Sequence, residues 1–393
     1  MKRRNIILRV SDADAAILSL KSAISGKSKS ELIRESFISH WPRSICPADT
    51  LLQMYREGNQ NDRDSIVHCL AAFYRQTGYP HVRMSNRKAD REMEKIAASP
   101  SPLLEDGSLT MNTVGIGMAN SFHPQMAKVR CMKGYRTPYE TYQNDEFLRD
   151  VIRRILDLGW KPTEAMVRKM LRVRDGVRSV VNFKPVISRF IYQQFCPHGG
   201  KSLDPYAGFG GRLSGCIASN MGLLYHGIDP VAETAAGNTR MAGIFSSIHG
   251  VFGPKWNFRF RFDIGCAEDV MPTLPDSSYD LVFTSPPYFD VEKYSDSPNQ
   301  SYRRYPVYHE WRDKFMAKVI NQSARVLSSG GHLVLNVKNY RKAPLVDDAM
   351  SIASETGLTF ITEHPMRLAN SEFFRKEGKP KFHTEPLLVW KKL

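Results

Sequence analysis

The sequence predicts an α/β fold with a doubly wound, mostly parallel sheet over residues 179–393, and three observations predict it. Short apolar runs alternate with helical segments along this stretch, a pattern typical of parallel sheets. The first run leads into a glycine-rich loop, "LDPYAGFGGRLSG". The second run ends in Asp229, about twenty residues after the glycines, where nucleotide-binding sheets place a ribose-binding acid.

Seven apolar runs are the candidate strands: "SLDPY", "LLYHGID", "FRFRFDIG", "YDLVFTS", "GHLVLNVKN", "LTFITEHPM" and "PLLVWKK". The last two are expected to form a closing antiparallel pair. Helices are expected to begin near Gly211, Val231, His309 and Leu345. Sheets of this kind bind ligands at the carboxyl ends of their strands, so the functional residues are expected there.

Residues 1–42 form a separate segment in which an alternating strand pattern, "RNIILRV", precedes two capped helical stretches divided by Gly26. This order resembles the ribbon-helix-helix fold of small repressors, in which two chains pair their strands and lay the ribbon in the major groove. The resemblance implies a homodimer in which Asn5, Ile7 and Arg9 face DNA bases. A small dimerisation or docking module is the alternative.

Residues 43–178 are expected to form a mainly helical region. The segment "EFLRDVIRRILDLGW" carries a helical stripe of apolar residues, which predicts a buried helix face. We expect this region to be a candidate for target recognition, ahead of a third domain that spans 179–393.

The amino-acid composition indicates the cellular compartment and the kind of binding partner. Lys and Arg number 55 against 40 acidic residues, a net charge of +15, which favours a polyanionic partner such as double-stranded DNA. No run approaches the roughly 20 apolar residues of a membrane span, and the start does not resemble a signal peptide. Six dispersed cysteines without a CxxC pair predict neither a metal site nor a disulfide framework, and they fit the cytoplasm.

The glycine-rich loop is the first candidate binding element. Gly208, Gly210 and Gly211 allow a tight turn and a close approach of the backbone to a ligand. Asp204, just before them, suits a ligand that carries an ammonium group. The third strand ends in "GCAEDV", where Cys266, Ala267 and Glu268 are candidates to edge an adenine ring, and Glu268 ranks below Asp229.

The fourth strand ends in "TSPPYFD", in which two prolines stiffen the loop and two aromatic residues follow them. Together with "DPYAGFGG", this motif resembles the motif pair of S-adenosylmethionine-dependent DNA amino-methyltransferases, and the "TSPPY" form is typical of enzymes that act on cytosine N4. The segments "NFKP" and "ARVLSSGGHLVLNVKN" are also similar to that family. The resemblance covers about residues 180–393 and implies a Rossmann-like class I methyltransferase domain with a seven-stranded sheet, of the kind common in bacteria and their phages.

The resemblance also implies roles for individual residues. The catalytic set is Ser285, Pro286, Pro287 and Tyr288. The expected binding set for S-adenosyl-L-methionine is Asn182, Phe183, Pro185, Asp204, Tyr206, Ala207, Gly208, Gly210, Asp229, Cys266, Ala267, Glu268 and Thr284. Phe289 is expected to help Tyr288 to stack on a base. Independently of the resemblance, Tyr302, Arg303 and Arg304 suit stacking and phosphate contact, and Arg9 is the DNA contact of the first segment.

The tetrapeptide has a physical rationale of its own. The lone pair of an exocyclic amino nitrogen is delocalised into the ring, so the amine is a poor nucleophile. Acceptors directed at its two N–H bonds, Ser285 Oγ and the Pro286 carbonyl, raise the electron density on nitrogen. Tyr288 is expected to stack on a base flipped out of the duplex.

Three alternatives remain at this stage. Adenine N6 presents the same amino group, and an RNA base is a further possible target. A DNA-binding regulator with an inactive methyltransferase fold is the candidate from another class of protein. Cytosine C5 methylation is disfavoured, because enzymes of that kind carry the necessary thiolate in a Pro-Cys motif and no cysteine here follows a proline.

Overall fold

The structure is a computed structural model that describes residues 48–250, 253–340, 343–368 and 383–393. The ribbon-helix-helix prediction for residues 1–42, including Arg9, lies outside the described residues. The chain divides into two compact units. Of the described residues, unit 1 comprises 48–81 and Pro138–Val177, and unit 2 comprises Val82–Thr137 and those from Arg178 to Leu393.

Unit 1 is helical in its described residues, as the sequence predicts for most of 43–178. Its helices are α3 (Ala48–Glu57), α4 (Gln60–Thr77), α7 (Pro138–Gln143), α8 (Asp145–Asp157) and α9 (Glu164–Val173). The Asn144 side chain caps α8 by accepting a hydrogen bond from the Phe147 backbone nitrogen. The predicted apolar stripe of α8 is buried from Leu148 to Leu156 and packs against α4 and α9.

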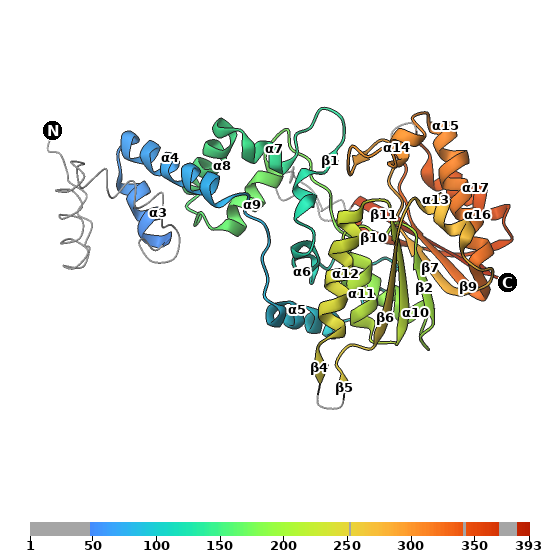
Figure 1. The fold of residues 1–393 in the computed structure, drawn as a ribbon. Coiled ribbons are helices and arrows are strands. Elements are labelled where there is room, and N and C mark those ends of the chain that lie inside the picture. Colours follow the sequence, from blue (N-terminus) through green and yellow to red (C-terminus); the bar gives the residue numbers. More distant parts are fainter. Residues whose placement is uncertain (1–47, 251–252, 341–342, 369–382) are drawn as a thin grey trace, which may run out of the picture. The chain divides into compact units, whose positions relative to one another are not determined.

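Unit 2 is built on a seven-stranded sheet (Figure 1). Its spatial order is β10 (Leu358–Leu368), β11 (His383–Lys392), β9 (Leu327–Asn336), β7 (Tyr279–Thr284), β2 (Lys201–Asp204), β3 (Leu223–Asp229) and β6 (Phe258–Ile264). Only β11 runs antiparallel to its two neighbours. The prediction of a doubly wound, mostly parallel, seven-stranded sheet with a closing antiparallel pair is confirmed.

Helices cover both faces of this sheet (Figure 1). One face carries α5 (Asn86–Ala98), α6 (Ile116–Ser121), α10 (Pro185–Phe195), α11 (Gly211–Ser219) and α12 (Ala232–Ser246). The other carries α13 (Ala267–Val270), α15 (Tyr308–Trp311), α16 (Ala317–Val326) and α17 (Leu345–Ser354). The remaining short elements are α14 (Ser301–Arg304), η1 (Pro124–Lys128), η2 (Met271–Thr273), the π-helical turn η3 (Arg312–Met316), and the strand pairs β1 (Arg130–Cys131) with β8 (Glu292–Lys293) and β4 (His249–Gly250) with β5 (Gly253–Pro254).

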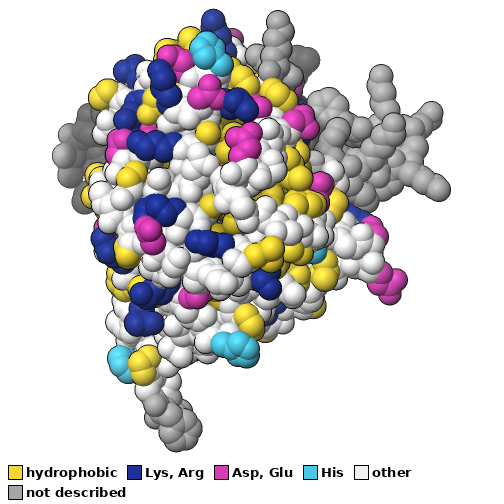
Figure 2. Space-filling view, turned by 90° about the vertical axis from the view of Figure 1, so that its right-hand side faces the viewer, with side chains coloured by type: hydrophobic (Ala, Val, Ile, Leu, Met, Phe, Trp, Pro, Cys, Tyr) yellow, Lys and Arg dark blue, Asp and Glu magenta, His cyan; other side chains and the backbone are white. Residues whose placement is uncertain are grey.

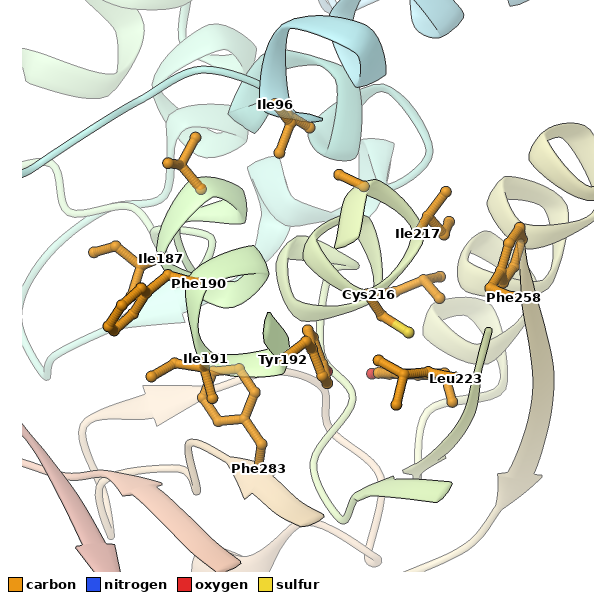
Figure 3. Close-up of a cluster of buried hydrophobic side chains, with 14 of the residues drawn as sticks. Ile96, Ile187, Phe190, Ile191, Tyr192, Cys216, Ile217, Leu223, Phe258 and Phe283 are labelled. Carbon is orange, nitrogen blue, oxygen red and sulfur yellow. The ribbon is translucent and has the colours of Figure 1, made fainter. Parts of the chain in front are cut away.

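The hydrophobic core on the α10–α11 face includes side chains of α5, which the sequence pattern had assigned to a separate helical region. Figure 3 shows Ile96 of α5 together with apolar side chains of α10, α11 and the sheet. Met93 and Ile96 are fully buried in this cluster. Residues 82–137 therefore belong with the sheet unit, whereas the sequence pattern predicted one helical region over the whole of 43–178. Among the described helices, none is both long and apolar enough to cross a membrane.

Candidate active site

The candidate site lies where the strand order of unit 2 changes direction. Strand β2 pairs with β3 on one side and with β7 on the other, so the loops after β2 and β7 leave the same edge of the sheet side by side. A cavity of about 330 Å³ opens there. Its wall includes Gly208 from the loop after β2 and Ser285 from the loop after β7. The two sequence motifs therefore line one cavity.

The glycine-rich loop is held by side chains that precede it in sequence. Gly208 and Gly210 have φ values of 56° and 78°, which favour glycine. Asn182 Oδ1 accepts a hydrogen bond from the Gly211 backbone nitrogen at 3.1 Å, and Asn182 Nδ2 donates to the Phe209 carbonyl at 2.6 Å. A Cβ on Gly211 would lie 2.2 Å from the Phe183 carbonyl oxygen, so this close approach requires glycine. The "NFKP" segment thus fixes the loop.

Asp204 occupies a different place from the one expected. Its carboxylate is fully buried and does not line the cavity. Its Oδ2 accepts hydrogen bonds from Arg212 Nε at 2.7 Å and from the Tyr225 hydroxyl at 2.6 Å, and its Oδ1 accepts one from the Thr284 hydroxyl at 2.8 Å. Direct contact of Asp204 with a ligand ammonium is therefore not supported. Instead, Asp204 joins β2, β3, β7 and α11 beneath the glycine loop.

Asp229 lies on the cavity wall at the end of β3, as predicted. Its Oδ2 accepts from the Gly208 backbone nitrogen at 3.1 Å and its Oδ1 from the Val231 nitrogen at 2.9 Å. Each oxygen keeps a further lone pair for a ligand hydroxyl. Burial raises the pKa of this carboxyl to about 6, while the two backbone hydrogen bonds act in the opposite direction.

Two buried polar atoms on the cavity wall have no hydrogen-bond partner among the residues that the structure describes. Glu268 Oε1 pairs with Arg304 at 2.6 Å, but Glu268 Oε2 is buried and makes no hydrogen bond. The Tyr206 hydroxyl is also buried without a partner. Burial raises the pKa of the Glu268 carboxyl, and the nearby Arg304 guanidinium opposes the shift. Buried polar groups that lack partners are rare, and at a cavity they mark positions that a polar ligand would satisfy.

The "TSPPY" corner places Ser285, Pro286, Pro287 and Tyr288 on the wall of the same cavity. The Ser285 hydroxyl donates to Asn336 Oδ1 at 3.3 Å, and Asn336 Nδ2 donates to the Pro386 carbonyl at 3.1 Å. This relay directs the hydroxyl proton toward β9, and the Tyr288 side chain is a second hydrogen-bonding neighbour of the Ser285 hydroxyl. Burial raises the pKa of Tyr288 well above its ordinary value, so this ring stays neutral.

The residues after this corner differ most from expectation. Phe289, at a φ of 52°, packs against Tyr308 and Trp311, with ring centroids 5.4 and 5.9 Å apart, and does not line the cavity. Arg304 pairs with Glu268 and Asp269 rather than standing free for a phosphate. Stacking by Phe289 and phosphate contact by Arg304 are therefore not supported, because both side chains are engaged internally.

Tyr302 and Arg303 also lie off the cavity wall. The Tyr302 hydroxyl donates to the Ser295 carbonyl at 3.1 Å, and Arg303 lies 3.8 Å from Asp296. Their predicted contacts with DNA remain predictions.

Most of the predicted cofactor-binding set meets at the cavity. Those that line it are Asn182, Phe183, Tyr206, Ala207, Gly208, Asp229, Cys266, Ala267 and Glu268. Those that do not are Pro185, Asp204, Gly210 and Thr284. Pro185 begins α10, and Thr284 is buried against Asp204, so both support the wall from behind.

Several cavity residues were not singled out from sequence. Glu292 follows the "TSPPY" motif by four positions, and Tyr294 follows it by six. Asn336 and Glu385 come from the ends of β9 and β11, and Lys184 precedes α10. Position at the end of a predicted strand was the available signal for Asn336, and Lys184 lies within the "NFKP" segment. Periodicity and motif spacing single out none of Glu292, Tyr294 and Glu385.

Comparisons with known proteins found similarity to solved structures. No protein-family model matches the chain, and no curated protein matches it. Solved structures similar to it include the cyclase SpnF, at 15% identity over 46% of this chain and 59% of that chain, with a TM-score of 0.33. A SAM-dependent methyltransferase from Methanosarcina mazei is 13% identical over 52% of this chain and 97% of that one, with a TM-score of 0.34.

A candidate DNA modification methylase from Thermus thermophilus is 22% identical over 33% of this chain, with a TM-score of 0.24. This chain covers half of that protein's length, at 50%. Because every TM-score here is below 0.5, the assignment of the fold rests on strand order and that of the site on its own geometry.

Proposed function

We propose that this chain is a DNA methyltransferase that transfers a methyl group from S-adenosyl-L-methionine to the exocyclic N4 amino group of cytosine. The observation that carries the proposal is the single cavity lined by Gly208 of the glycine loop and Ser285 of the proline corner. A ligand bound at Gly208 and an amine bound at Ser285 would therefore be adjacent. Positioning of this kind supplies much of the rate in reactions between two bound groups.

The residues present fit S-adenosylmethionine. Asp229 offers carboxylate lone pairs for ribose hydroxyls, and the orphaned Glu268 Oε2 suits an amino donor such as that of adenine. The backbone from Tyr206 to Gly208 lines the cavity beside them. When bound, the ligand supplies an electrophilic methyl group on a sulfonium centre.

The target amine is the partner of the proline corner in this proposal. Ser285 accepts a hydrogen bond from one N–H because its own proton is directed to Asn336. The Pro286 carbonyl accepts the other, and two consecutive prolines limit movement of the loop. Tyr288, uncharged and on the cavity wall, offers a stacking surface for an extruded base.

The cytosine assignment draws on the "TSPPY" form of the motif, and adenine N6 is the second candidate because it offers the same two N–H bonds. Sequencing for modified bases in DNA from cells that express the chain separates the two. We expect N4-methylcytosine in a defined sequence context, and its absence from cells that express Ser285→Ala. N6-methyladenine in that DNA would replace the cytosine assignment with the adenine one.

A regulator with an inactive methyltransferase fold is the remaining rival. It predicts that purified protein binds S-adenosylmethionine, or DNA, and leaves every base unmodified. The partnerless Glu268 Oε2 and Tyr206 hydroxyl favour a working ligand site over a relic, since such atoms are costly to bury without a ligand.

A further inference from the structure

Glu292 is held against the proline corner by two independent contacts. Its strand, β8, pairs with β1, which sets Glu292 opposite Cys131. The Tyr288 backbone nitrogen donates a hydrogen bond to Glu292 Oε2 at 3.1 Å. Glu292, Ser285 and Tyr288 all line the same cavity, so Glu292 borders the space in which the target amine would sit. No function in the sequence motifs accounts for this carboxyl.

The charged groups around Glu292 are mixed in sign, since Lys184, Arg212 and Arg367 line the same cavity. Negative groups act on it from Glu385 of β11 and from Asp290 of its own loop, while Cys131, Tyr288 and Tyr294 are uncharged neighbours. Among the described residues, no Lys or Arg forms an ion pair with Glu292, whereas Glu385 lies 3.9 Å from Lys338. Burial, aided by Glu385 and Asp290, raises the pKa of Glu292 to about 7.

Methylation of an amine requires a proton acceptor. The nitrogen lone pair forms the new bond to the methyl carbon as the carbon–sulfur bond breaks, so sulfur becomes neutral and nitrogen carries the positive charge. One N–H proton must then leave to give the neutral methylated amine. Ser285 and the Pro286 carbonyl accept hydrogen bonds but are too weakly basic to keep a proton near neutral pH.

We propose that Glu292 is a catalytic residue that takes this proton, and the inference rests on the methyl transfer proposed above. The electron pair of the broken N–H bond stays on nitrogen, and the Glu292 carboxylate becomes a neutral carboxylic acid. The proton returns to solvent after the product leaves. Asp290 is exposed to solvent and Glu385 is near a cation, so Glu292 is the better placed carboxylate of the three.

The test compares the wild-type chain with Glu292→Gln, which keeps an oxygen able to accept from the Tyr288 nitrogen. Glu355→Gln, an exposed carboxylate after α17, is the matched control. Single-turnover methyl transfer to duplex DNA is followed between about pH 5.5 and pH 8.5, together with S-adenosylmethionine affinity. Difference infrared spectroscopy of the carboxyl band, without DNA, reports the ionisation of Glu292 independently of activity.

We expect the wild-type rate to rise with pH and to level off above about pH 7, and Glu292→Gln to lower the plateau by about 100-fold without that rise. Cofactor affinity should change by less than about twofold, and a carboxyl band that titrates near neutrality should vanish only in Glu292→Gln. Wild-type-like transfer by Glu292→Gln, or an unchanged carboxyl titration, overturns the inference and leaves the proposed function standing. A wild-type chain that transfers no methyl group overturns both.

Discussion

Asp229 combines a position suited to ribose with a carboxyl group that is costly to ionise. Its pKa is raised by burial to about 6, so the carboxylate predominates above that pH and is lost as the pH falls through it. If the ionised form is the one that accepts the ribose hydroxyls, S-adenosylmethionine affinity should fall by up to about tenfold for each pH unit below 6. Isothermal titration calorimetry from about pH 5 to pH 8 measures this dependence.

The control for this prediction is Asp229→Asn, which keeps the shape of the side chain and removes its titration. We expect weaker binding of S-adenosylmethionine by the variant and no slope near pH 6. Two other cavity carboxyls, Glu268 and Glu292, also have raised pKa values. A slope that persists in Asp229→Asn would therefore assign the pH dependence to one of them.

We predict that Asn336 orients the Ser285 hydroxyl, which would accept a hydrogen bond from the target amine, and that Asn336 does not itself contact substrate. Its amide accepts from Ser285 and is itself fixed by the Pro386 carbonyl. Asn336→Ala should lower kcat by up to about 100-fold while S-adenosylmethionine affinity is kept, because the serine proton is then free to point at the amine. Asn336→Asp, which still accepts from Ser285, should recover part of the loss. Equal kcat values for Asn336→Ala and Asn336→Asp would contradict this positioning role of Asn336.

Sequence patterns identified residues on the cavity wall better than they assigned their contacts. Asp229 was found because it ends a strand near the switch point. Ser285 was found because the "TSPPY" motif resembles that of DNA amino-methyltransferases. Asp204 was expected to bind a ligand because an acid just before a glycine loop suits an ammonium group. Its burial against Arg212 and Tyr225 depends on side chains from α11 and β3, which strand patterns do not reveal.

The turn from β2 into α11 depends on glycine in a way that a matched pair of variants can isolate. A Cβ at Gly211 would meet the Phe183 carbonyl at 2.2 Å, whereas a Cβ at Gly243, exposed in α12, meets nothing within 4 Å. Gly211→Ala should displace the loop at a cost of about 1–3 kcal/mol in stability and weaken S-adenosylmethionine binding. Gly243→Ala should leave binding unchanged and stabilise the fold by about 0.5–1 kcal/mol.

Thermal unfolding and calorimetric titration of both variants check this prediction. Retention of wild-type affinity by Gly211→Ala would contradict the view that "NFKP" and the glycine loop are locked together. A destabilised Gly243→Ala would show instead that α12 tolerates no added methyl group for a reason outside its immediate contacts.

The strands were the most predictable elements, since each buried strand reads as a short apolar run between turns. The run "LLYHGID" coincides with β3, and α11 begins at Gly211 as expected. The short strand pair β1–β8 was not predicted, because two-residue strands show no periodicity and these two strands lie about 160 residues apart in the chain. This pair contains Glu292, which lines the cavity.

Division of the chain into units could not be derived from composition. Both 82–137 and 138–177 have more Lys and Arg than acidic residues, yet the first packs on the sheet and the second forms unit 1 with the preceding helices. The deciding contacts are those of Met93 and Ile96 with the core of unit 2. Such long-range packing overrides local pattern.

The net charge of +15 is not concentrated on the face of the molecule drawn in Figure 2. Dark-blue Lys and Arg side chains are spread over that face with carboxylates between them. The charge therefore supports attraction to a polyanion in general, and it does not identify which segment reads a target sequence.

The central claim is that one cavity delivers a methyl group to an amine held at Ser285. The most direct measurement is mass spectrometry of nucleosides from duplex DNA incubated with the purified chain and methyl-labelled S-adenosylmethionine. We predict labelled N4-methylcytosine from the wild-type chain and none from Ser285→Ala. Tight binding of S-adenosylmethionine without any labelled nucleoside would contradict the account.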